Sequence, residues 1–392
     1  MNRNDAFALF HRVVELRHRP EEISTLFGVD HEPIVGFLDT GFPEEVALAA
    51  GYRPMLLTGD PSRAPETVTP HLDVSAPARI RSLYEVLATG GYDGLDVLCV
   101  TGGDRWIGET AGFFEVYAEV FGSPRIARTL YLERARGQFS AHRDYNRDGI
   151  AVMVEEMGAV SGRAVTEAAL EDAISVLNRT RALLRRLEAL RTAAVPTVSG
   201  ADAAAVTLAA LLSPRQAFNE ALDAALDAVT ASPPVGLRGP RVFVSGSSLD
   251  HSGHIELIEG LGGVVVGEDT EFGLRSAHHP VDEASGDPIG ALADRLTYKF
   301  PESWAFGRER RLTLRAELAA ASSPDAVIAL HLQGDSAYGW DYPDFAAALA
   351  EQGVPALPLS DLDYALGDAD DLSARIAAFL GGLTDQHDKE QA

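Results

Sequence analysis

Two serines follow an apolar stretch in the second half of the chain, at a place where a ligand could be held. In SGSSLDHSGHIELIEG, Gly246, Ser247 and Ser248 lie between an expected strand and an expected helix. Backbone N–H groups and hydroxyls in such a turn can hold a phosphate or a carboxylate, although they also make an ordinary turn with a helix cap. The turn matches neither G-x-G-x-x-G nor G-x-x-x-x-G-K-S/T, so it is not a nucleotide-binding fingerprint.

A second candidate pocket wall is the loop TGGDRWIGETAGFF, residues 101–114, which follows another apolar stretch. The loop places an acid, a cation and a large aromatic ring next to one another at Asp104, Arg105 and Trp106. Arg105 can pair with an anion, and Trp106 can cover an acyl or aromatic group, although tryptophan is also a common core residue. We expect this loop to line a ligand pocket.

Two carboxylates, Glu44 and Glu45, open an expected helix directly after Pro43. Negative charge is favoured in the first helical turn, and proline suits the first position of a helix. Helix capping explains the pair by itself, since a catalytic acid or base also needs burial and a partner. Glu44 remains a candidate for substrate binding because it follows the loop after the first expected strand.

Histidines gather at His251, His254, His278 and His279. His251 and His254 are three residues apart, a spacing that suits zinc when carboxylates complete the ligand set. No H-E-x-x-H or comparable ligand set accompanies them. We therefore expect solvated or helix-capping histidines and no metal site.

The charge of the chain limits its partners. The 33 basic residues are outnumbered by 58 acidic ones, which gives a formal net charge of −25 and argues against nucleic-acid or anionic-membrane partners. A polyanionic ligand such as coenzyme A would need local positive charge. The loops expected at strand ends supply such charge at Arg53, Arg105 and Arg275, and Arg134 and Arg136 follow the fourth strand.

Cysteine content and hydropathy indicate a cytoplasmic protein. Cys99 is the only cysteine, so neither a disulfide nor a cysteine-ligated cluster can form within this chain. The first twenty residues have no long apolar core or small-residue cleavage pattern, and no apolar stretch reaches the length of a membrane span. Cys99 falls inside an expected strand, where we expect it to be a small buried apolar residue.

Strands alternate with helices in both halves, which predicts an α/β fold with mainly parallel sheets covered on both faces. Residues 5–26 are expected to form one helix that packs by its apolar face. The first half predicts strands at Ile34–Leu38, Pro54–Leu57, Asp96–Thr101 and Arg128–Leu132, with helices at Pro43–Ala50, Ala78–Thr89 and Thr110–Phe121.

The second half repeats the alternation after a helical connector rich in Ala, Leu, Glu and Arg. Strands are expected at Arg241–Ser245, Gly263–Val266, Ala326–Leu330 and Ala356–Leu359, with helices at Ile255–Gly260, about Arg308–Ala321, Tyr342–Gln352 and from Asp371 onward. The expected organisation is an N-terminal helix (1–28), a first α/β domain (29–142), the helical connector (143–236) and a second α/β domain (237–392). Ligands of open α/β sheets bind at the carboxyl ends of the strands.

Five segments, taken in order, resemble the 2-hydroxyacyl-CoA dehydratase and benzoyl-CoA reductase subunits. They are VGFLDTGFPEEVALAAGYRPMLL, LDVLCVTGGDRWIG, AVTEAALEDAISVLNRTRALLRRLEALR, PRVFVSGSSLDHSGHIELIEGLGGVVVGEDTEFGLR and DAVIALHLQGDSAYGWDYPDFAAALAEQGVPALPLSDLDY. The resemblance covers the chain from about residue 30 to residue 383. It implies two doubly wound domains that face each other across a cleft, and pairing with a homologous subunit.

The resemblance also implies a chemistry. In that family, a subunit usually holds an iron–sulfur cluster through three cysteines, and an ATP-dependent activator supplies an electron that reaches an acyl-CoA thioester. The reaction is then either dehydration by a lyase or reduction by an oxidoreductase. At the positions that match the cysteines, this chain has Asp39, Gly103 and Gly334. We therefore expect no cofactor on this chain and a 4Fe–4S cluster in a cysteine-bearing partner.

Two functions are compatible with this loss of cysteines. In the first, the chain is the cluster-free subunit of a heteromeric dehydratase or reductase and shapes an acyl-CoA pocket for its partner. In the second, it is a non-redox protein that binds a CoA ester or another small anion in the emptied cleft. The first is favoured because the whole two-domain frame is retained. The expected substrate-binding residues are Asp39, Glu44, Arg53, Asp104, Arg105, Trp106, Ser247, Ser248 and Arg275.

Overall fold

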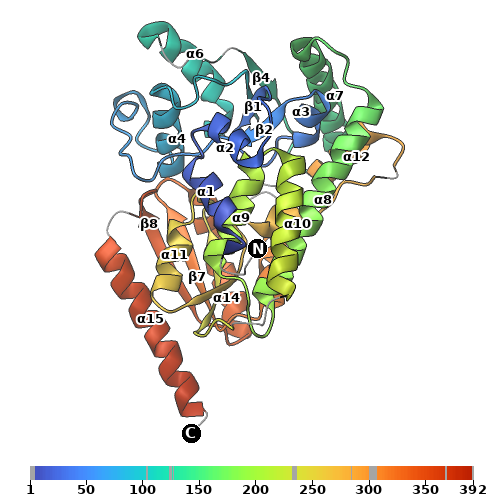
Figure 1. The fold of residues 1–392 in the computed structure, drawn as a ribbon. Helices are drawn as coiled ribbons and strands as arrows, with labels where there is room; N and C mark the ends of the chain where they lie inside the picture. Colours follow the sequence, from blue (N-terminus) through green and yellow to red (C-terminus); the bar gives the residue numbers. More distant parts are fainter. Residues whose placement is uncertain are drawn as a thin grey trace.

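Two four-stranded parallel sheets form the frame of the protein, as the α/β alternation predicts (Figure 1). The computed structural model describes residues 5–102, 105–122, 126, 128–231, 236–283, 285–299, 307–366 and 369–390. The first sheet has the order β2-β1-β3-β4 and the second β6-β5-β7-β8, so each begins in its middle and winds outward in both directions. This is the predicted doubly wound class.

The strands of the first sheet are β1 (Ile34–Phe37), β2 (Arg53–Leu56), β3 (Val97–Thr101) and β4 (Thr129–Leu132). Those of the second are β5 (Arg241–Gly246), β6 (Val264–Glu268), β7 (Ala326–Leu332) and β8 (Ala356–Leu362). Every residue of β1, β2 and β3 is buried, as expected for parallel strands covered on both faces. In register, Phe37 lies opposite Leu56 on one side and Cys99 on the other.

Helices cover both sheets and connect them. The first sheet is flanked by α1 (Ala8–Glu15), α2 (Pro20–Phe27), α3 (Glu44–Ala49), α4 (Ala78–Ala88), α5 (Arg105–Gly108) and α6 (Thr110–Phe121). The connector comprises α7 (Ser140–Ser161), α8 (Glu167–Thr192), α9 (Gly200–Leu212) and α10 (Arg215–Ala231). The second half adds α11 (Gly253–Gly260), α12 (Pro288–Asp294), α13 (Arg308–Ser322), α14 (Ser336–Glu351) and α15 (Ala369–Glu390), with short turns η3 (Leu274–His278) and η4 (Arg295–Lys299).

The expectation of one helix over residues 5–26 is wrong, because α1 ends at Glu15 and α2 begins at Pro20. Proline has no backbone N–H to donate, so it starts a helix more readily than it continues one. The expected start of α14 at Tyr342 is also wrong, since the helix begins at Ser336 and includes Pro343. The strand boundaries agree with the prediction more closely, apart from β8, which extends to Leu362.

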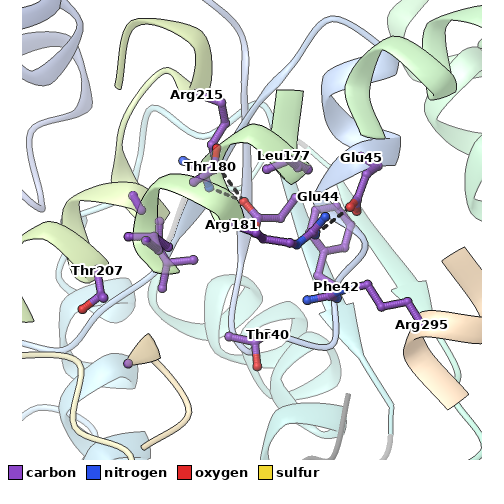
Figure 2. A pocket seen from close by; sticks show the side chains of 14 residues that line it. Thr40, Phe42, Glu44, Glu45, Leu177, Thr180, Arg181, Thr207, Arg215 and Arg295 are labelled. Carbon is purple, nitrogen blue, oxygen red and sulfur yellow. Dashed lines mark hydrogen bonds and ion pairs between the residues drawn. The ribbon is translucent and has the colours of Figure 1, made fainter. Parts of the chain in front are cut away.

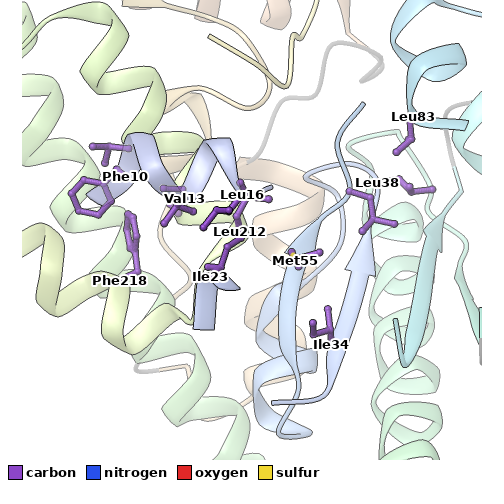
Figure 3. Close-up of a cluster of buried hydrophobic side chains, with 14 of the residues drawn as sticks. Phe10, Val13, Leu16, Ile23, Ile34, Leu38, Met55, Leu83, Leu212 and Phe218 are labelled. Carbon is purple, nitrogen blue, oxygen red and sulfur yellow. The ribbon is translucent and has the colours of Figure 1, made fainter. Parts of the chain in front are cut away.

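The largest core joins the first sheet to the N-terminal helices and to the connector helices α8, α9 and α10. Figure 3 shows Phe10 of α1 and Phe218 of α10 in this core together with Ile34 and Met55 of the strands. The Phe10 and Phe218 rings meet edge to face, with 5.4 Å between their centroids. A second core places Phe272 and α12 beside the first sheet, although both follow β6 in the chain. The predicted domain boundaries stay a prediction.

In the described part of the chain, no helix has both the length and the apolar character needed to cross a bilayer.

Candidate functional site

The carboxyl ends of the two sheets face each other and touch. The loop after β1 contacts the loop after β6, where Thr40 donates its backbone N–H and its hydroxyl to Glu271 Oε1 at 3.2 and 3.0 Å. The backbone N–H of Ala78, at the start of α4, donates to the carbonyl of Gln333 after β7 at 3.0 Å. The expected ligand edge of each sheet is therefore also the junction between the sheets.

Asp250, just after β5, is a buried carboxylate at this junction that accepts from three donors. It is 1% exposed, and its Oδ2 accepts from the backbone N–H of Gly59 at 3.2 Å and from Arg79 Nε at 3.1 Å. Its Oδ1 accepts from the Tyr364 hydroxyl. Arg79 also donates to the carbonyl of Leu38 at 2.9 Å, which ties the end of β1 to the same carboxylate. Gly59, Leu38 and Arg79 belong to the first half, so one carboxylate joins both halves.

This carboxylate is held in its ionised form. Burial opposes the charge, but Arg79 and the hydrogen bond from Tyr364 outweigh it and lower the pKa of Asp250. Burial and the neighbouring Asp250 raise the pKa of Tyr364 well above its usual value, so this phenol stays protonated and can donate. An ionised acceptor and a neutral donor make a strong hydrogen bond at the junction.

Asp39, which follows β1, is buried, and both of its carboxylate oxygens accept hydrogen bonds. Its Oδ1 accepts from the Gly41 backbone N–H at 2.9 Å, and its Oδ2 accepts from the Thr101 hydroxyl at 2.6 Å. Arg134 Nη2 lies 3.4 Å from the same Oδ2. The Arg134 guanidinium also fills the space that a side chain at Gly41 would need. The loop after β1 is thus closed by an internal charge pair.

Gly334 follows β7 and lies against the first half of the chain. Its φ of +82° is favourable for glycine and unfavourable for other residues. A Cβ at this position would lie 2.9 Å from Pro77 Cα and 3.3 Å from the Ser75 carbonyl oxygen. Backbone atoms cannot yield as a flexible side chain can, so the loop has no room for a larger residue.

Both candidate serines hold the turn together. The backbone N–H of Ser247 donates to the Leu330 carbonyl at 2.8 Å, and its hydroxyl accepts from the Leu332 N–H at 3.0 Å. The hydroxyl of Ser248 accepts from the backbone N–H of Glu271 at 2.8 Å. These bonds support the structural interpretation of the turn and leave a ligand role untested.

The loop after β3 is described only in part. Asp104 and Gly103 lie outside the described residues, as does the side chain of Arg105. Trp106 is half-buried and packs against the first core, and its carbonyl accepts from the Tyr84 hydroxyl at 2.9 Å.

Arg53 lies elsewhere than the strand-end prediction placed it. It is the first residue of β2, so it sits at the amino edge of the sheet, away from Asp39. Its Nη1 donates to the Ser24 hydroxyl at 2.9 Å and its Nη2 to the Pro20 carbonyl at 3.1 Å. Burial lowers the pKa of Arg53 to about 10. The expected strand, which began at Pro54, already placed Arg53 at its amino end, so the assignment of this arginine to a ligand-side loop was wrong.

Arg275 lies on the ligand side of the second sheet. It belongs to η3, which follows β6, and is 4% exposed. Its Nη1 donates to the Tyr338 hydroxyl of α14 at 3.2 Å. The structure therefore brings Arg275, Ser247, Ser248 and Asp39 to the junction, whereas Arg53 is remote from it.

Glu44 and Glu45 take part in a buried charge cluster, shown in Figure 2. Glu45 Oε1 accepts from Arg181 of α8 at 2.7 Å, and Glu44 accepts from Arg215 Nε at 3.0 Å. Burial opposes the charge of Glu45, yet Arg181 and Arg295 outweigh it and lower its pKa. The cluster borders a cavity of about 40 Å³, which suits a few water molecules and no larger ligand.

Sequence reasoning explained both glutamates by helix capping and kept Glu44 as a candidate for substrate binding, but it missed their arginine partners, which lie far along the chain. The available signal was weak: two acids open α3, and α8 carries an arginine-rich repeat. Charges of opposite sign on separate helices pair only when the tertiary fold brings them together. The cluster ties the loop after β1 to the connector helices.

The histidines differ from their expected environment. His251 is buried, lies 2.8 Å from the Tyr364 carbonyl through Nε2, and accepts from the Gly253 N–H at the start of α11 at 3.2 Å. His254 is also buried, and burial lowers its pKa to about 3. Solvation is therefore the wrong expectation for both, and capping is right for His251. No three His, Cys, Asp or Glu side chains gather as a metal site within the described ranges.

The frame and its junction define an α/β protein with facing parallel sheets, and comparison with known proteins places it in a family. Residues 39–383 match the family described as 2-hydroxyglutaryl-CoA dehydratase, D-component. The chain therefore belongs to this family, in agreement with the resemblance found in the sequence.

Three relatives show the kind of protein that it is similar to. Lactoyl-CoA dehydratase subunit beta of Anaerotignum propionicum is 21% identical over 360 residues, which is 88% of this chain and 90% of the relative. The (R)-phenyllactyl-CoA dehydratase beta subunit of Clostridium sporogenes is 20% identical, with 88% and 90% covered. The (R)-2-hydroxyglutaryl-CoA dehydratase subunit beta of Acidaminococcus fermentans is 21% identical, with 96% and 99% covered.

The residues described here do not fit an iron–sulfur cluster. Cys99 is fully buried within β3, and burial raises the pKa of its thiol well above the usual value, so it stays a neutral apolar residue as expected. Asp39 already accepts from two donors and pairs with Arg134, and Gly334 has no space for a ligand side chain.

Replacing Asp250 with asparagine should destabilise the junction strongly. Removing one partner of a buried ion pair costs about 3–5 kcal/mol. The folded pKa of Asp250 is lowered, so its contribution is complete above the unfolded pKa of about 3.9 and is lost as the pH falls through the folded pKa. Urea titrations at pH 7 and pH 3 should show a smaller difference between wild type and D250N at pH 3. An equal difference at both pH values would contradict the assignment.

Replacing Gly334 with alanine should test whether this position can accept a side chain. Overpacking typically costs about 1–3 kcal/mol, in addition to the strain of a positive φ. Gly353 is a matched control, because its φ is +73° and no atom lies within 4 Å of the point that a Cβ would occupy there. G334A should therefore lower the free energy of unfolding more than G353A does. Equal losses would show that the junction can accommodate a cysteine here.

Proposed function

We propose that this chain is a cluster-free subunit of a heteromeric 2-hydroxyacyl-CoA dehydratase. In this proposal it shapes the acyl-CoA pocket, and a homologous cysteine-bearing subunit carries the 4Fe–4S cluster. The observation that carries the proposal is that two positions matching the family's cluster cysteines, Asp39 and Gly334, have no space for a cluster ligand. The Asp39 carboxylate accepts hydrogen bonds from Thr101 and Gly41 and pairs with Arg134, and Gly334 packs against Pro77.

Membership of the dehydratase family supports a role as a subunit, because three relatives are named as beta subunits of such enzymes. The retained frame supports a role that depends on shape. Both sheets still direct their carboxyl ends at one junction, which is where ligands of such sheets bind. The retention of this arrangement therefore supports a role in forming a pocket.

The charge of the junction supports an acyl-CoA as the ligand. The chain carries a net charge of −25, so phosphate groups would be repelled unless arginines lie nearby. Arg275 lies on the ligand side of the second sheet and donates to Tyr338, whereas Arg134 and Arg79 are already paired with Asp39 and Asp250. Arg53, in contrast, is too remote to take part.

Co-expression tests the proposal directly. The chain should be produced with a cysteine-bearing family member from the same genome, purified without oxygen, and separated into subunits for iron and sulfide analysis. We expect a stable complex in which iron and sulfide follow the partner. Stoichiometric iron on this chain would overturn the proposal. Binding of CoA esters by this chain alone, with no complex formed, would favour the non-redox alternative.

Replacing Arg275 with alanine should weaken acyl-CoA binding by the complex by roughly ten- to a hundredfold, since a hydrogen bond to a charged group contributes about 1.5–3 kcal/mol. Arg186→Ala is the control, because Arg186 pairs with Asp223 and Asp227 on the exposed connector. Calorimetric titration with a CoA thioester measures both variants, and a urea midpoint checks their folding. Equal affinities for the two folded variants would remove Arg275 from the site.

A further inference from the structure

Exposed apolar side chains are concentrated in one stretch of the sequence. Within the described residues, eleven large apolar or aromatic side chains are exposed, and seven of them fall between residues 116 and 152. Scattered exposed apolar residues are ordinary, but a concentration of this kind is typical of an interaction surface. The seven are Val116, Val120, Phe121, Tyr131, Phe139, Tyr145 and Val152.

The centre of the region is β4, an edge strand of the first sheet. Its residues alternate between buried and exposed, with Leu130 and Leu132 buried and Tyr131 exposed. The opposite edge strand, β2, is buried along its whole length. Among the strands that the structure describes, none pairs with the outer edge of β4. An open edge of this kind is usually covered or protected in a native protein.

Helix α7 adds an aromatic face beside this edge. Tyr145 and Val152 are seven residues apart and therefore lie on the same side of α7, and Phe139 directly precedes the helix. Burial and Glu133 raise the pKa of Tyr131 to about 12, and the nearby Tyr145 contributes to this shift. Helix α7 packs directly against β4, because Gly149 of α7 lies against Leu132 and Glu133. We call Tyr131, Phe139, Tyr145 and Val152 the β4 patch.

The surroundings of the β4 patch are acidic. Asp148 and Glu155 are exposed on α7, and Glu115 and Glu119 are exposed on α6 beside Val116 and Val120. Figure 1 shows α6 and α7 at the same end of the molecule as β4. Both arginines of α7 are already occupied, because Arg143 pairs with Asp294 and Arg147 with Asp287.

The acidic rim decides which occupant fits. Two copies of this chain, each with a net charge of −25, would bring like charges together if the patch met itself. A different chain that carries lysine or arginine around an apolar centre would meet no such repulsion. Apolar centres with polar rims are the usual composition of protein interfaces.

We propose that the β4 patch is the docking surface for the partner subunit, and that the partner presents an apolar centre with a basic rim. This inference rests on the proposed function, which supplies the expectation of a partner. It goes further by assigning the contact to the outer edge of the first sheet. The junction between the two sheets stays free for the ligand.

The test compares two double variants of the full chain. Tyr145→Glu with Val152→Glu introduces charge into the patch, and Val74→Glu with Val195→Glu does the same at exposed valines elsewhere. Binding to the cysteine-bearing family member is measured by titration at low and high salt. We expect the patch variant to bind at least about tenfold more weakly, the control to bind as wild type does, and added salt to weaken wild-type binding.

Each result has a distinct meaning. Because all four positions are exposed, both variants should keep the wild-type urea midpoint, and hydrogen exchange of residues 139–152 should slow when the partner binds. A complex that forms equally well with the patch variant would overturn the surface assignment and leave the proposed function intact. Failure of the wild type to bind would overturn both. A wild-type homodimer that the patch variant abolishes would show a self-contact and contradict the heterologous partner.

Discussion

The arrangement of the two sheets depends on the Asp250 carboxylate. This single buried group accepts hydrogen bonds from Gly59 and Arg79 of the first half and from Tyr364 of the second. A buried charge is tolerated only when it is paired and its lone pairs are satisfied, so the three donors must stay in place together. The strand ends can therefore hardly separate without leaving this charge uncompensated.

Much of the fold was predictable because local patterns and tertiary structure agree. Continuous apolar stretches between helical segments indicate buried parallel strands, and the doubly wound sheets follow from the way such units connect. The errors occurred where a proline had two possible effects. Pro20 divides the N-terminal segment into two helices, whereas Pro343 lies within α14. Local sequence cannot separate these outcomes, because packing of the surrounding helix decides them.

The candidate site was less predictable, since its contacts join residues that are far apart in the chain. Ser247 and Ser248 stand out by a turn pattern, but their bonds go to β7 and to Glu271, which no local pattern reveals. Asp250 lies in the same loop and does not stand out, because an aspartate in a polar loop has no distinguishing neighbour in sequence. Arg181 and Arg215 are similar cases, since each pairs with a glutamate more than 130 residues away.

The contacts that hold the junction also leave little space for cysteine side chains at the ends of β1 and β7. A cluster needs several thiolates with open space between them. Here the space after β1 is filled by the Arg134 guanidinium, and the loop after β7 is pressed against Pro77. A cysteine at Gly334 would therefore require the backbone at Pro77 and Ser75 to move. Loops that are closed in this way suit a fixed surface better than an iron site, and the proposed function divides the roles of the two subunits accordingly.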